Sequence, residues 1–455
     1  MTFVLFAAVS AAIVAAWNRW LGRVPWRIAG LFFAIVAAYQ APTLFTSRVD
    51  LPAALANNVY PWRAVNRPSV NANSGIVITQ LAPWTRVARE AMFRGELPLW
   101  NRNAASGAPL LANQQTAIFH PFTLLGLFLP IGKAFTLSAS LRLFVVALFM
   151  FILLRNFAIG TPAAIFGALA YTFCTFHVIW LLFPLGLATM MLPACLVGVQ
   201  EVARAPRIAS YLFLVIALAC AILGGHPESA LWVWITTAAF AMFLRKHIAL
   251  IASAFVAAML LTAFFWVPTI NILRATERFQ NAHSRDLNPA NHHLGREWIE
   301  TLVAPNILGT PMRGDYQPPR GGHATIPNDY GEIASGYAGL LTLIAALAAP
   351  FVARKRPLWF AIGLMLFVLL TISEAPLWRD LIREIPLAGI SLHQRLRILW
   401  VLGVCIAAAF AINRIPRFAP IATVIVLGDL LYTTRGYNPP AKPRDVYPKI
   451  GRAHV

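Results

Sequence analysis

The sequence predicts an all-α polytopic membrane protein, and three observations support this fold class. Of its 455 residues, 59% are hydrophobic and only 12% are charged, whereas about a quarter of the residues in a soluble domain are charged. Long apolar runs follow one another through most of the chain, and Lys and Arg recur in alternate connections between them. This pattern is typical of a single bundle of spanning helices rather than of several soluble domains.

Twelve apolar segments are candidates for spanning helices. A span takes roughly 17 to 25 mainly apolar residues, and several segments are short or flanked by proline, so we expect about 12 spans within a range of roughly 10 to 13. The segments are 1–17, 28–45, 134–154, 161–181, 185–200, 208–224, 229–244, 248–267, 336–353, 357–373, 396–413 and 418–434.

The charges between these segments predict which ends of the helices face the cytoplasm. Basic residues in alternate connections mark the cytoplasmic side. Glu201 is the only acidic residue there and Asp429 the only one within a span, so the other acidic residues face outward. The formal charge of +20 then reflects topology, and we expect a lipid bilayer and no nucleic acid as partner. The cytoplasmic basic residues are Arg19, Arg23, Arg27, Arg155, Arg204, Arg207, Arg245, Lys246, Arg354, Lys355, Arg356, Arg414 and Arg417.

The longest connections, 46–133 and 268–335, both lie on the predicted outer side. Long loops in compact proteins usually carry function, so we expect the chemistry of this protein on its outer face. The bundle with these loops covers 1–434, and 435–449 reads as the start of a truncated outer C-terminal domain. The last six residues, 450–455, match the translation of a common sequencing adapter and are excluded as a probable artefact.

Within the first outer segment, the residues from Trp84 to Phe93 have amphipathic spacing and are followed by Gly95. This predicts a short helix lying along the membrane interface. Asp50, just after the second span, is a candidate base or cation ligand at the outer interface. The alternative is a solvated carboxylate paired with Arg48.

Four polar residues of the other outer connections are further candidates. His226 and Glu228 stand in a Gly-His-Pro-Glu turn between two spans, where a plain hairpin turn would need neither side chain. Asp315 and Glu332 lie in the second long segment among glycines and prolines. Carboxylates from two loops can converge over one pocket, and the alternative is a hydrophilic loop with solvated charges.

Several arginines are candidates for binding an anionic group. The first outer segment is rich in arginine, including Arg86, and guanidinium groups suit a phosphate or, without specificity, anionic headgroups. Arg395 and Arg397 begin a span from the outer side, where burying a charge costs about 2.5 kcal/mol or more. This cost favours a partner, either a loop carboxylate or a donor phosphate. Asp429 is either functional or snorkels to the interface.

A series of motifs runs along nearly the whole chain. The motifs are Gln80–Trp84, Gly95–Asn101, Gly107–Asn113, Phe119–Pro121, Gly225–Glu228, Arg313–Tyr316, Tyr330–Glu332, Gly336–Leu341, Arg395–Arg397, Asp429–Leu431 and Tyr437–Pro439. Together they resemble the YfhO-type bacterial membrane proteins, which look like part of the GT-C superfamily of integral-membrane glycosyltransferases. The resemblance implies a GT-C-like fold in the bacterial cytoplasmic membrane and sugar transfer from a polyprenyl-phosphate donor to a cell-envelope acceptor on the outer, periplasmic face.

The resemblance also implies roles for single residues. In the family pattern an Asp stands four residues before Gln80, where this chain has Ile76, so Asp50 would have to substitute, with Glu332 as a second catalytic carboxylate. The motif residues Gln80, Asn101, Asn113, His226, Glu228, Asp315, Arg395 and Arg397 are expected to bind substrate. Arg86, which lies outside the motifs, is added to them for its guanidinium group.

Three functional interpretations therefore stand beside one another. The first is a polyprenyl-phosphate-dependent glycosyltransferase, the second a transporter or flippase of lipid-linked glycans, and the third a catalytically inactive family member. For the glycosyltransferase, the sequence leaves open whether a divalent metal ion is a cofactor. We also expect Asp50, His226 and Glu332 to line one outer cavity.

Overall fold

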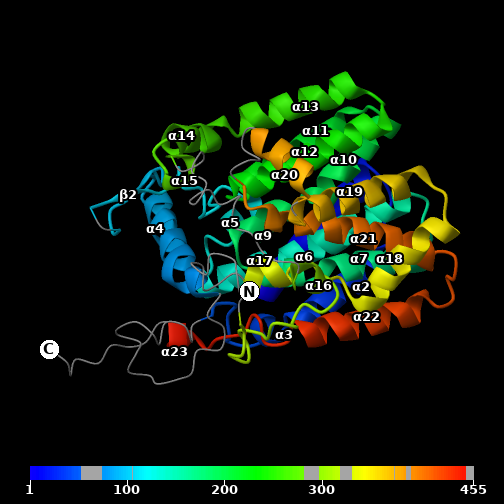
Figure 1. Cartoon of the computed structure of the whole chain (residues 1–455). Helices are drawn as coiled ribbons and strands as arrows, with labels where there is room; N and C mark the ends of the chain where they lie inside the picture. The colour runs from blue at the N-terminus through cyan, green and yellow to red at the C-terminus, as the bar shows by residue number, and fades with distance from the viewer. Residues whose placement is uncertain are drawn as a thin grey trace.

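The structure is a computed structural model that describes residues 1–52, 74–104, 106–280, 297–317, 330–373, 375–385 and 391–446. It is all-α apart from one two-residue strand pair (Figure 1). The predicted fold class is confirmed at this level. The loop parts 53–73, 281–296 and 318–329, and the predicted artefact 450–455, lie outside the described residues.

The elements follow in chain order. They are α1 (Thr2–Trp20), α2 (Trp26–Tyr39), α3 (Ala41–Leu44), η4 (Val77–Leu81), α4 (Ala82–Phe93), β1 (Trp100–Asn101), β2 (Ala108–Pro109), α5 (Pro121–Leu125), α6 (Ile131–Asn156), α7 (Thr161–Thr172), α8 (Thr175–Ile179), α9 (Pro184–Thr189), α10 (Leu192–Arg204), α11 (Ile208–Leu223), α12 (Pro227–Leu244), α13 (Ile248–Leu261), α14 (Ala263–Leu273), α15 (Glu277–Gln280), α16 (Glu297–Glu300), α17 (Tyr330–Ala334), α18 (Leu340–Val352), α19 (Arg356–Ile372), α20 (Pro376–Glu384), η8 (His393–Leu396), α21 (Arg397–Ile412), α22 (Ala419–Thr433) and α23 (Pro443–Val446).

Within the described residues, five helices are long and apolar enough to cross a membrane, or six if the bent pair α13 and α14 forms one span. The five are α1, α6, α9 with α10, α12, and η8 with α21. The predicted count of twelve spans is therefore wrong. Helices α2, α11, α18, α19 and α22 are apolar but have 10 to 17 residues, which is short of the roughly 20 needed for the hydrocarbon core.

Breaks inside the apolar runs explain a part of this difference that helix length does not. The run 161–181 is divided between α7 and α8, and the run 248–267 bends by 75° at Thr262 between α13 and α14. A summed hydropathy does not report such breaks, because it depends on composition and not on whether the backbone hydrogen bonds continue.

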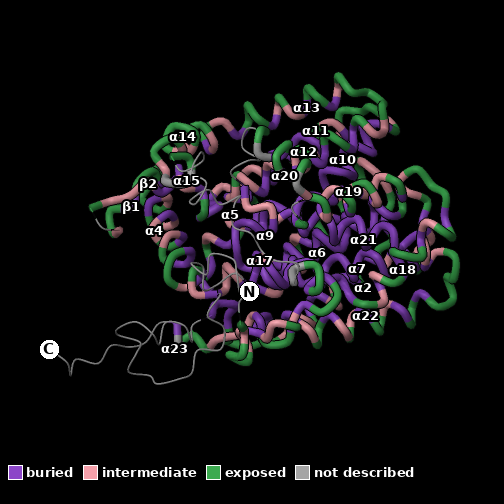
Figure 2. The backbone as a smooth tube through the Cα atoms, viewed as in Figure 1, coloured by how far each residue is buried: buried purple, intermediate pink, exposed green. Residues whose placement is uncertain are grey.

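The core is centred on α6 and α21, which lie among the other helices in Figure 2. All side chains of α6 from Thr136 to Leu154 are buried. Helix α6 packs against α1, α2, α7 and α10, whereas α21 packs against α7, α18 and α19. The peripheral helices expose large apolar residues instead, among them Leu260, Phe351 and Val424. A bundle that is apolar both inside and outside suits a lipid environment.

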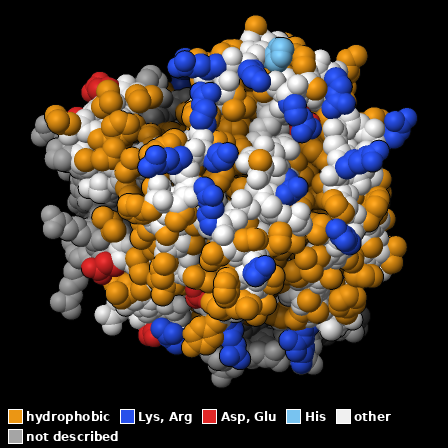
Figure 3. Space-filling model, turned by 90° about the vertical axis from the view of Figure 1, so that its right-hand side faces the viewer, with side chains coloured by type: hydrophobic (Ala, Val, Ile, Leu, Met, Phe, Trp, Pro, Cys, Tyr) orange, Lys and Arg blue, Asp and Glu red, His pale blue; other side chains and the backbone are white. Residues whose placement is uncertain are grey.

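One end of the bundle carries exposed Lys and Arg. Figure 3 views this end and shows many basic and few acidic side chains. The basic residues of the turns after α12, α18 and α21, including Arg245, Lys355 and Arg414, are exposed. Glu201, the acidic residue predicted on this side, is buried and bonded to Arg204 at 2.8 Å. The arrangement agrees with the charge pattern that predicted the cytoplasmic side.

The predicted amphipathic helix from Trp84 to Phe93 is confirmed as α4, which ends before Gly95. Residues 435–446 include a bridge from Ala441 to Val49 and the short helix α23. The start of the predicted C-terminal segment therefore pairs with the chain just before Asp50.

Candidate functional site

Three polar side chains from two other segments meet around Arg395. Its Nη1 lies 3.1 Å from Oε2 of Glu228 and 3.2 Å from Nε2 of His226, and its Nη2 lies 3.3 Å from Oε1 of Glu332. The side chains of Arg395, Glu228 and Glu332 are between 10% and 16% exposed. We call these four residues the Arg395 cluster.

The sequence of the Gly-His-Pro-Glu turn explains how it presents His226 and Glu228. His226 is the N-cap of α12, where its Nδ1 accepts from the Ser229 amide at 3.2 Å. Pro227 occupies the first helical turn, where its missing N–H is not needed, and Glu228 places negative charge at the positive end of the helix. A neutral imidazole accepts at one nitrogen only, so His226 either caps α12 or accepts from Arg395.

Gly225 is required at the start of this turn. Its φ is +80°, and a Cβ at this position would lie 2.5 Å from the Gln114 carbonyl oxygen. Only glycine adopts this conformation without strain while letting the two backbones approach so closely. The turn that carries His226 is thus packed directly on the segment around Gln114.

The other half of the cluster comes from η8 and α17. The amide of Leu392 donates to Oε1 of Glu228 at 2.9 Å, which fixes Glu228 beside the segment that leads to Arg395. Glu332 lies on α17. Among the described residues, two carboxylates surround one guanidinium group, and hydrogen bonds in such a set are charge-assisted. The cluster sits at the N-terminal ends of α12 and α21, whose C-terminal ends carry the exposed basic residues.

Arg397 lies next to this cluster but is fully buried. Its Nη1 donates to the Thr301 hydroxyl at 3.2 Å. The absence of a side chain at Gly336 makes room for it, because a Cβ there would lie 2.9 Å from Arg397 Nη1. The predicted need for a partner is met for Arg395 by carboxylates and for Arg397 by a hydroxyl.

Asp50 lies in a different environment. It is 5% exposed, and its amide donates to the Thr136 hydroxyl at 3.2 Å. Burial raises the pKa of Asp50 to about 6, against the opposing effect of Thr43, Thr136 and the Lys133 charge. The interpretation as a solvated carboxylate paired with Arg48 does not describe it, and its Oδ2 has no hydrogen-bond partner among the described residues. A carboxylate with a raised pKa suits a general base near neutral pH.

In the described parts of the chain, no hydrogen bond or ion pair joins Asp50 to the Arg395 cluster. The predicted cavity of Asp50, His226 and Glu332 stays a prediction, whereas His226 and Glu332 do meet around one arginine.

Asp315 and Arg86 have local partners at the surface. Asp315 closes a turn by accepting from the Thr310 amide at 2.7 Å and from Arg313 Nε at 2.8 Å. The hydrogen bond from the Thr310 amide, and to a smaller extent the one from Arg313, lowers the pKa of Asp315. Arg86 pairs with Glu90 one turn along α4 at 2.8 Å, with both side chains about half exposed.

The remaining motif residues have structural roles or are exposed. Asn101 and Asn113 each accept from the backbone amide two residues later, at 3.0 and 2.8 Å, which is typical of Asx turns. Gln80 and Ile76 are exposed beside η4. Arg86 and Asn101 also line an open groove of about 810 Å³ between α4 and β1.

Asp429 has a structural partner set. Its Oδ2 accepts from the Tyr337 hydroxyl at 2.6 Å and from the Leu340 amide at 3.0 Å, at the start of α18. This carboxylate joins α22 to α18 rather than pointing into an open site. Among the described residues, no group of three or more His, Cys, Asp or Glu side chains is placed to hold a metal ion.

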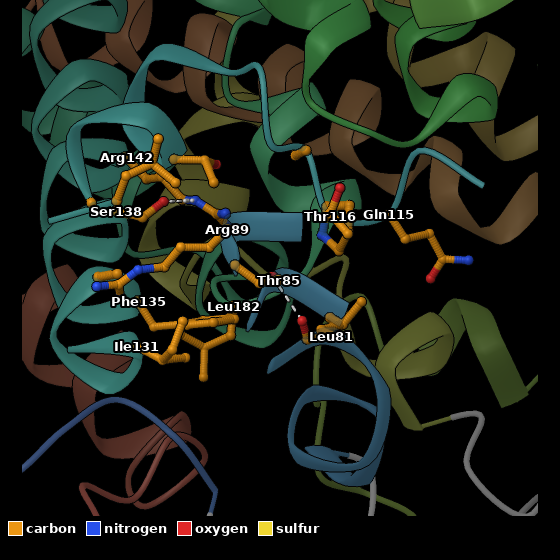
Figure 4. A pocket seen from close by; sticks show the side chains of 16 residues that line it. Leu81, Thr85, Arg89, Gln115, Thr116, Ile131, Phe135, Ser138, Arg142 and Leu182 are labelled. Carbon is orange, nitrogen blue, oxygen red and sulfur yellow. Dashed lines mark hydrogen bonds between the residues drawn. The ribbon is translucent and has the colours of Figure 1, made fainter. Parts of the chain in front are cut away.

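The sequence prediction missed Arg142, which lies within α6 and is 6% exposed. It lines a pocket together with Arg89 of α4 (Figure 4). The signal was present, because Arg142 is a charged residue inside the apolar run 134–154 and such a residue is a functional hypothesis by default.

No protein family profile and no curated protein matches the chain.

Proposed function

We propose that the chain is a multi-pass membrane protein of the bacterial cytoplasmic membrane that transfers sugar from a polyprenyl-phosphate donor to a cell-envelope acceptor. The proposal places the reaction at the outer, periplasmic face. The family resemblance supplies the activity. The observation that carries the site is the Arg395 cluster, which joins three segments at the end of α12 and α21 remote from their basic C-terminal ends.

The reaction needs a base and a stabilised leaving group. A carboxylate takes the proton of the acceptor hydroxyl, whose oxygen forms a bond to the anomeric carbon. The bond from this carbon to the phosphate oxygen breaks, and the departing polyprenyl phosphate keeps the electron pair. Asp50 and Glu332 are the two candidate bases, and a positioned cation would stabilise the phosphate.

The two candidate bases differ in how readily their carboxylates accept a proton. Glu332 is held by Arg395, and an adjacent guanidinium group makes a carboxylate a weaker base. Asp50 has a pKa raised by burial to about 6, which is closer to the working pH of a general base. Asp50 is therefore the first candidate for the base. Glu332 is a candidate for orienting the acceptor, through its contact with Arg395.

Two observations favour the second candidate function, a transporter or flippase of lipid-linked glycans. Transporters place charged residues on spans and use broken helices. Buried Arg142 and the 75° bend between α13 and α14 are features of this kind. The inactive-member interpretation draws on exposed Ile76 at the position of the family's acidic residue.

The test uses the full chain purified into liposomes and given a labelled polyprenyl-phosphate-linked sugar with a cell-envelope glycan acceptor. We expect labelled acceptor and released polyprenyl phosphate. Asp50→Asn should lower turnover by about 10²- to 10⁴-fold, while Glu96→Gln, which removes an exposed carboxylate paired with Arg94, should not change it. Movement of the lipid-linked sugar across the bilayer without transfer would replace the transferase by the transporter.

A further inference from the structure

A pocket bounded by α4, α6 and the connections before α5 and α9 encloses about 560 Å³, open side included. Arg142 and Arg89 line it with the hydroxyl residues Thr85, Thr116 and Ser138. Figure 4 shows the Arg142 guanidinium group beside Ser138 and directed into the pocket. No carboxylate pairs with either arginine among the described residues.

Arg142 is a buried cation held only by neutral groups. It lies about three helical turns into α6. Its Nε donates to the Ser138 hydroxyl at 3.2 Å, and its Nη1 donates to the backbone carbonyls of Phe183, at 3.0 Å, and Leu181. Its Nη2 makes no hydrogen bond within the described residues. Since a buried charge without a counter-charge is costly, the position is explained by an anion that the pocket receives.

Arg89 provides a second cation at the same pocket. It donates to the Leu129 carbonyl, and its guanidinium lies 5.1 Å from the ring centre of Phe93. The hydroxyl of Thr116 is a further polar group on the wall, and Thr116 is buried. Two guanidinium groups with hydroxyl donors match the acceptors of a phosphate.

The arginines predicted from the sequence are engaged elsewhere. Arg86 is paired with Glu90, Arg395 with two glutamates, and Arg397 is enclosed beside Thr301. A donor phosphate at any of them would have to displace an existing partner. At Arg142 it would add the missing counter-charge.

We infer that this pocket binds a phosphate group, with Arg142 and Arg89 as its cationic ligands. The apolar side chains of Leu81, Leu127 and Phe135 complete the wall and suit the first units of a prenyl chain. The pocket lies near the turn that carries His226, because Ala117 lines the pocket and a side chain at Gly225, the residue before His226, would lie 3.1 Å from the Ala117 Cβ. That the phosphate belongs to the sugar donor rests on the proposed function.

The test measures binding of farnesyl phosphate and of inorganic phosphate to the detergent-purified full chain. Arg142→Lys keeps the charge but loses the fork of donors, and Arg89→Gln removes a charge from the less buried helix. Arg94→Gln is the matched control, because it removes a charge from the exposed end of the same helix α4. We expect each pocket variant to weaken binding about tenfold or more, with Arg94→Gln unchanged.

The two probes distinguish the sources of the phosphate. Preference for farnesyl phosphate assigns the pocket to a lipid phosphate, and equal binding of both probes assigns it to free phosphate. Binding that both pocket variants leave unchanged, in protein that elutes as a folded monodisperse species, overturns the inference. If binding depends on the two arginines but the protein transfers no sugar, the phosphate site stands and the proposed function is wrong. If the protein transfers sugar but binding does not depend on these arginines, the proposed function stands and this site is wrong.

Discussion

The Arg395 cluster and the Arg142 pocket are built on the same principle of a buried arginine but differ in how the charge is balanced. Arg395 lies between two carboxylates at 3.1 and 3.3 Å. Within the described part of the chain, Arg142 is bonded only to a hydroxyl and two carbonyl oxygens. A balanced arginine organises the protein, because removing it strands buried acids. An unbalanced one is available for an external anion.

This comparison places Asp50 with Arg142. Asp50 is a buried carboxylate whose Oδ2 has no partner among the described residues, and Lys133, the nearby cation, donates to the carbonyls of Thr43, Thr46 and Arg48. Both groups lower the stability of the fold in their charged forms. We therefore interpret both as positions where function is favoured over stability.

The largest expected effect comes from removing the two arginines in turn. Arg395→Met leaves Glu228 and Glu332 without their cation and should lower the free energy of unfolding by about 3 kcal/mol. Arg142→Met removes an unbalanced charge and replaces it with an apolar side chain of similar length, so the change should stay within about 1 kcal/mol. Thermal unfolding of the purified variants measures both.

Arg395→Lys is the control, since it keeps the charge but loses the two-sided geometry, and it should fall between the wild type and Arg395→Met. If Arg142→Met destabilises the protein as much as Arg395→Met, the distinction between a balanced and an unbalanced arginine is wrong.

The second prediction concerns Asp50. Its pKa is raised from 3.8 to about 6, so ionisation costs stability in the folded state. At pH 4 and below the carboxyl is protonated in the folded state and the penalty is small. As the pH rises from 4 towards 6, the Asp50 carboxyl ionises in the unfolded state but stays protonated in the folded state, which favours unfolding. Above pH 6 it is ionised in both states, and the full cost of the buried charge applies. Asp50→Asn should thus stabilise the protein by about 2 to 3 kcal/mol at pH 7.5 and much less at pH 4.

Asp315 provides a control of opposite sign. The Thr310 amide and Arg313 lower its pKa, so its ionised form contributes stability that is lost as the pH falls. Asp315→Asn should therefore be slightly destabilising at pH 7.5. An Asp50→Asn variant that is destabilised at pH 7.5 would show that the carboxylate has a stabilising partner.

Much of the helical architecture could be predicted from the sequence, because apolar runs and the basic connections between them are local features. Helices α6, α12, α19 and α21 lie within two or three residues of segments read from hydropathy. The span count failed because breaks such as the bend at Thr262 depend on packing, which a running hydropathy does not contain.

The site was predictable where a residue type is unusual for its place. A His and a Glu in a turn, and an Arg at the start of a span, pointed to His226, Glu228 and Arg395. Their pairing with Glu332 could not be read from the sequence, because Arg395 is separated from Glu332 by 63 positions along the chain. Arg142 was missed because a single basic residue hardly lowers the hydropathy of a run of 26 helical residues.

The third prediction tests whether the two regions are connected at Gly225. An alanine there would require φ near +80° and would bring Cβ to 2.5 Å from the Gln114 carbonyl oxygen, so Gly225→Ala should cost about 2 kcal/mol. Gly428→Ala, in α22, meets nothing within 4 Å and should be neutral or slightly stabilising. Thermal unfolding reports the cost. Gly225→Ala should also weaken farnesyl phosphate binding, and unchanged binding would separate the turn from the pocket.

The smallest effect is expected at His226, where it decides what the imidazole does. His226→Ala removes the N-cap of α12, whose acceptor is 3.2 Å from the Ser229 amide, and should cost about 1 kcal/mol. Asparagine is a good N-cap and should restore that stability, but it cannot titrate near neutral pH. Sugar transfer measured on both variants then separates the roles. If His226→Asn restores stability and turnover together, the imidazole only caps the helix. If it restores stability while turnover stays at the level of His226→Ala, the contact with Arg395 takes part in the chemistry, because the cap alone is intact in that variant.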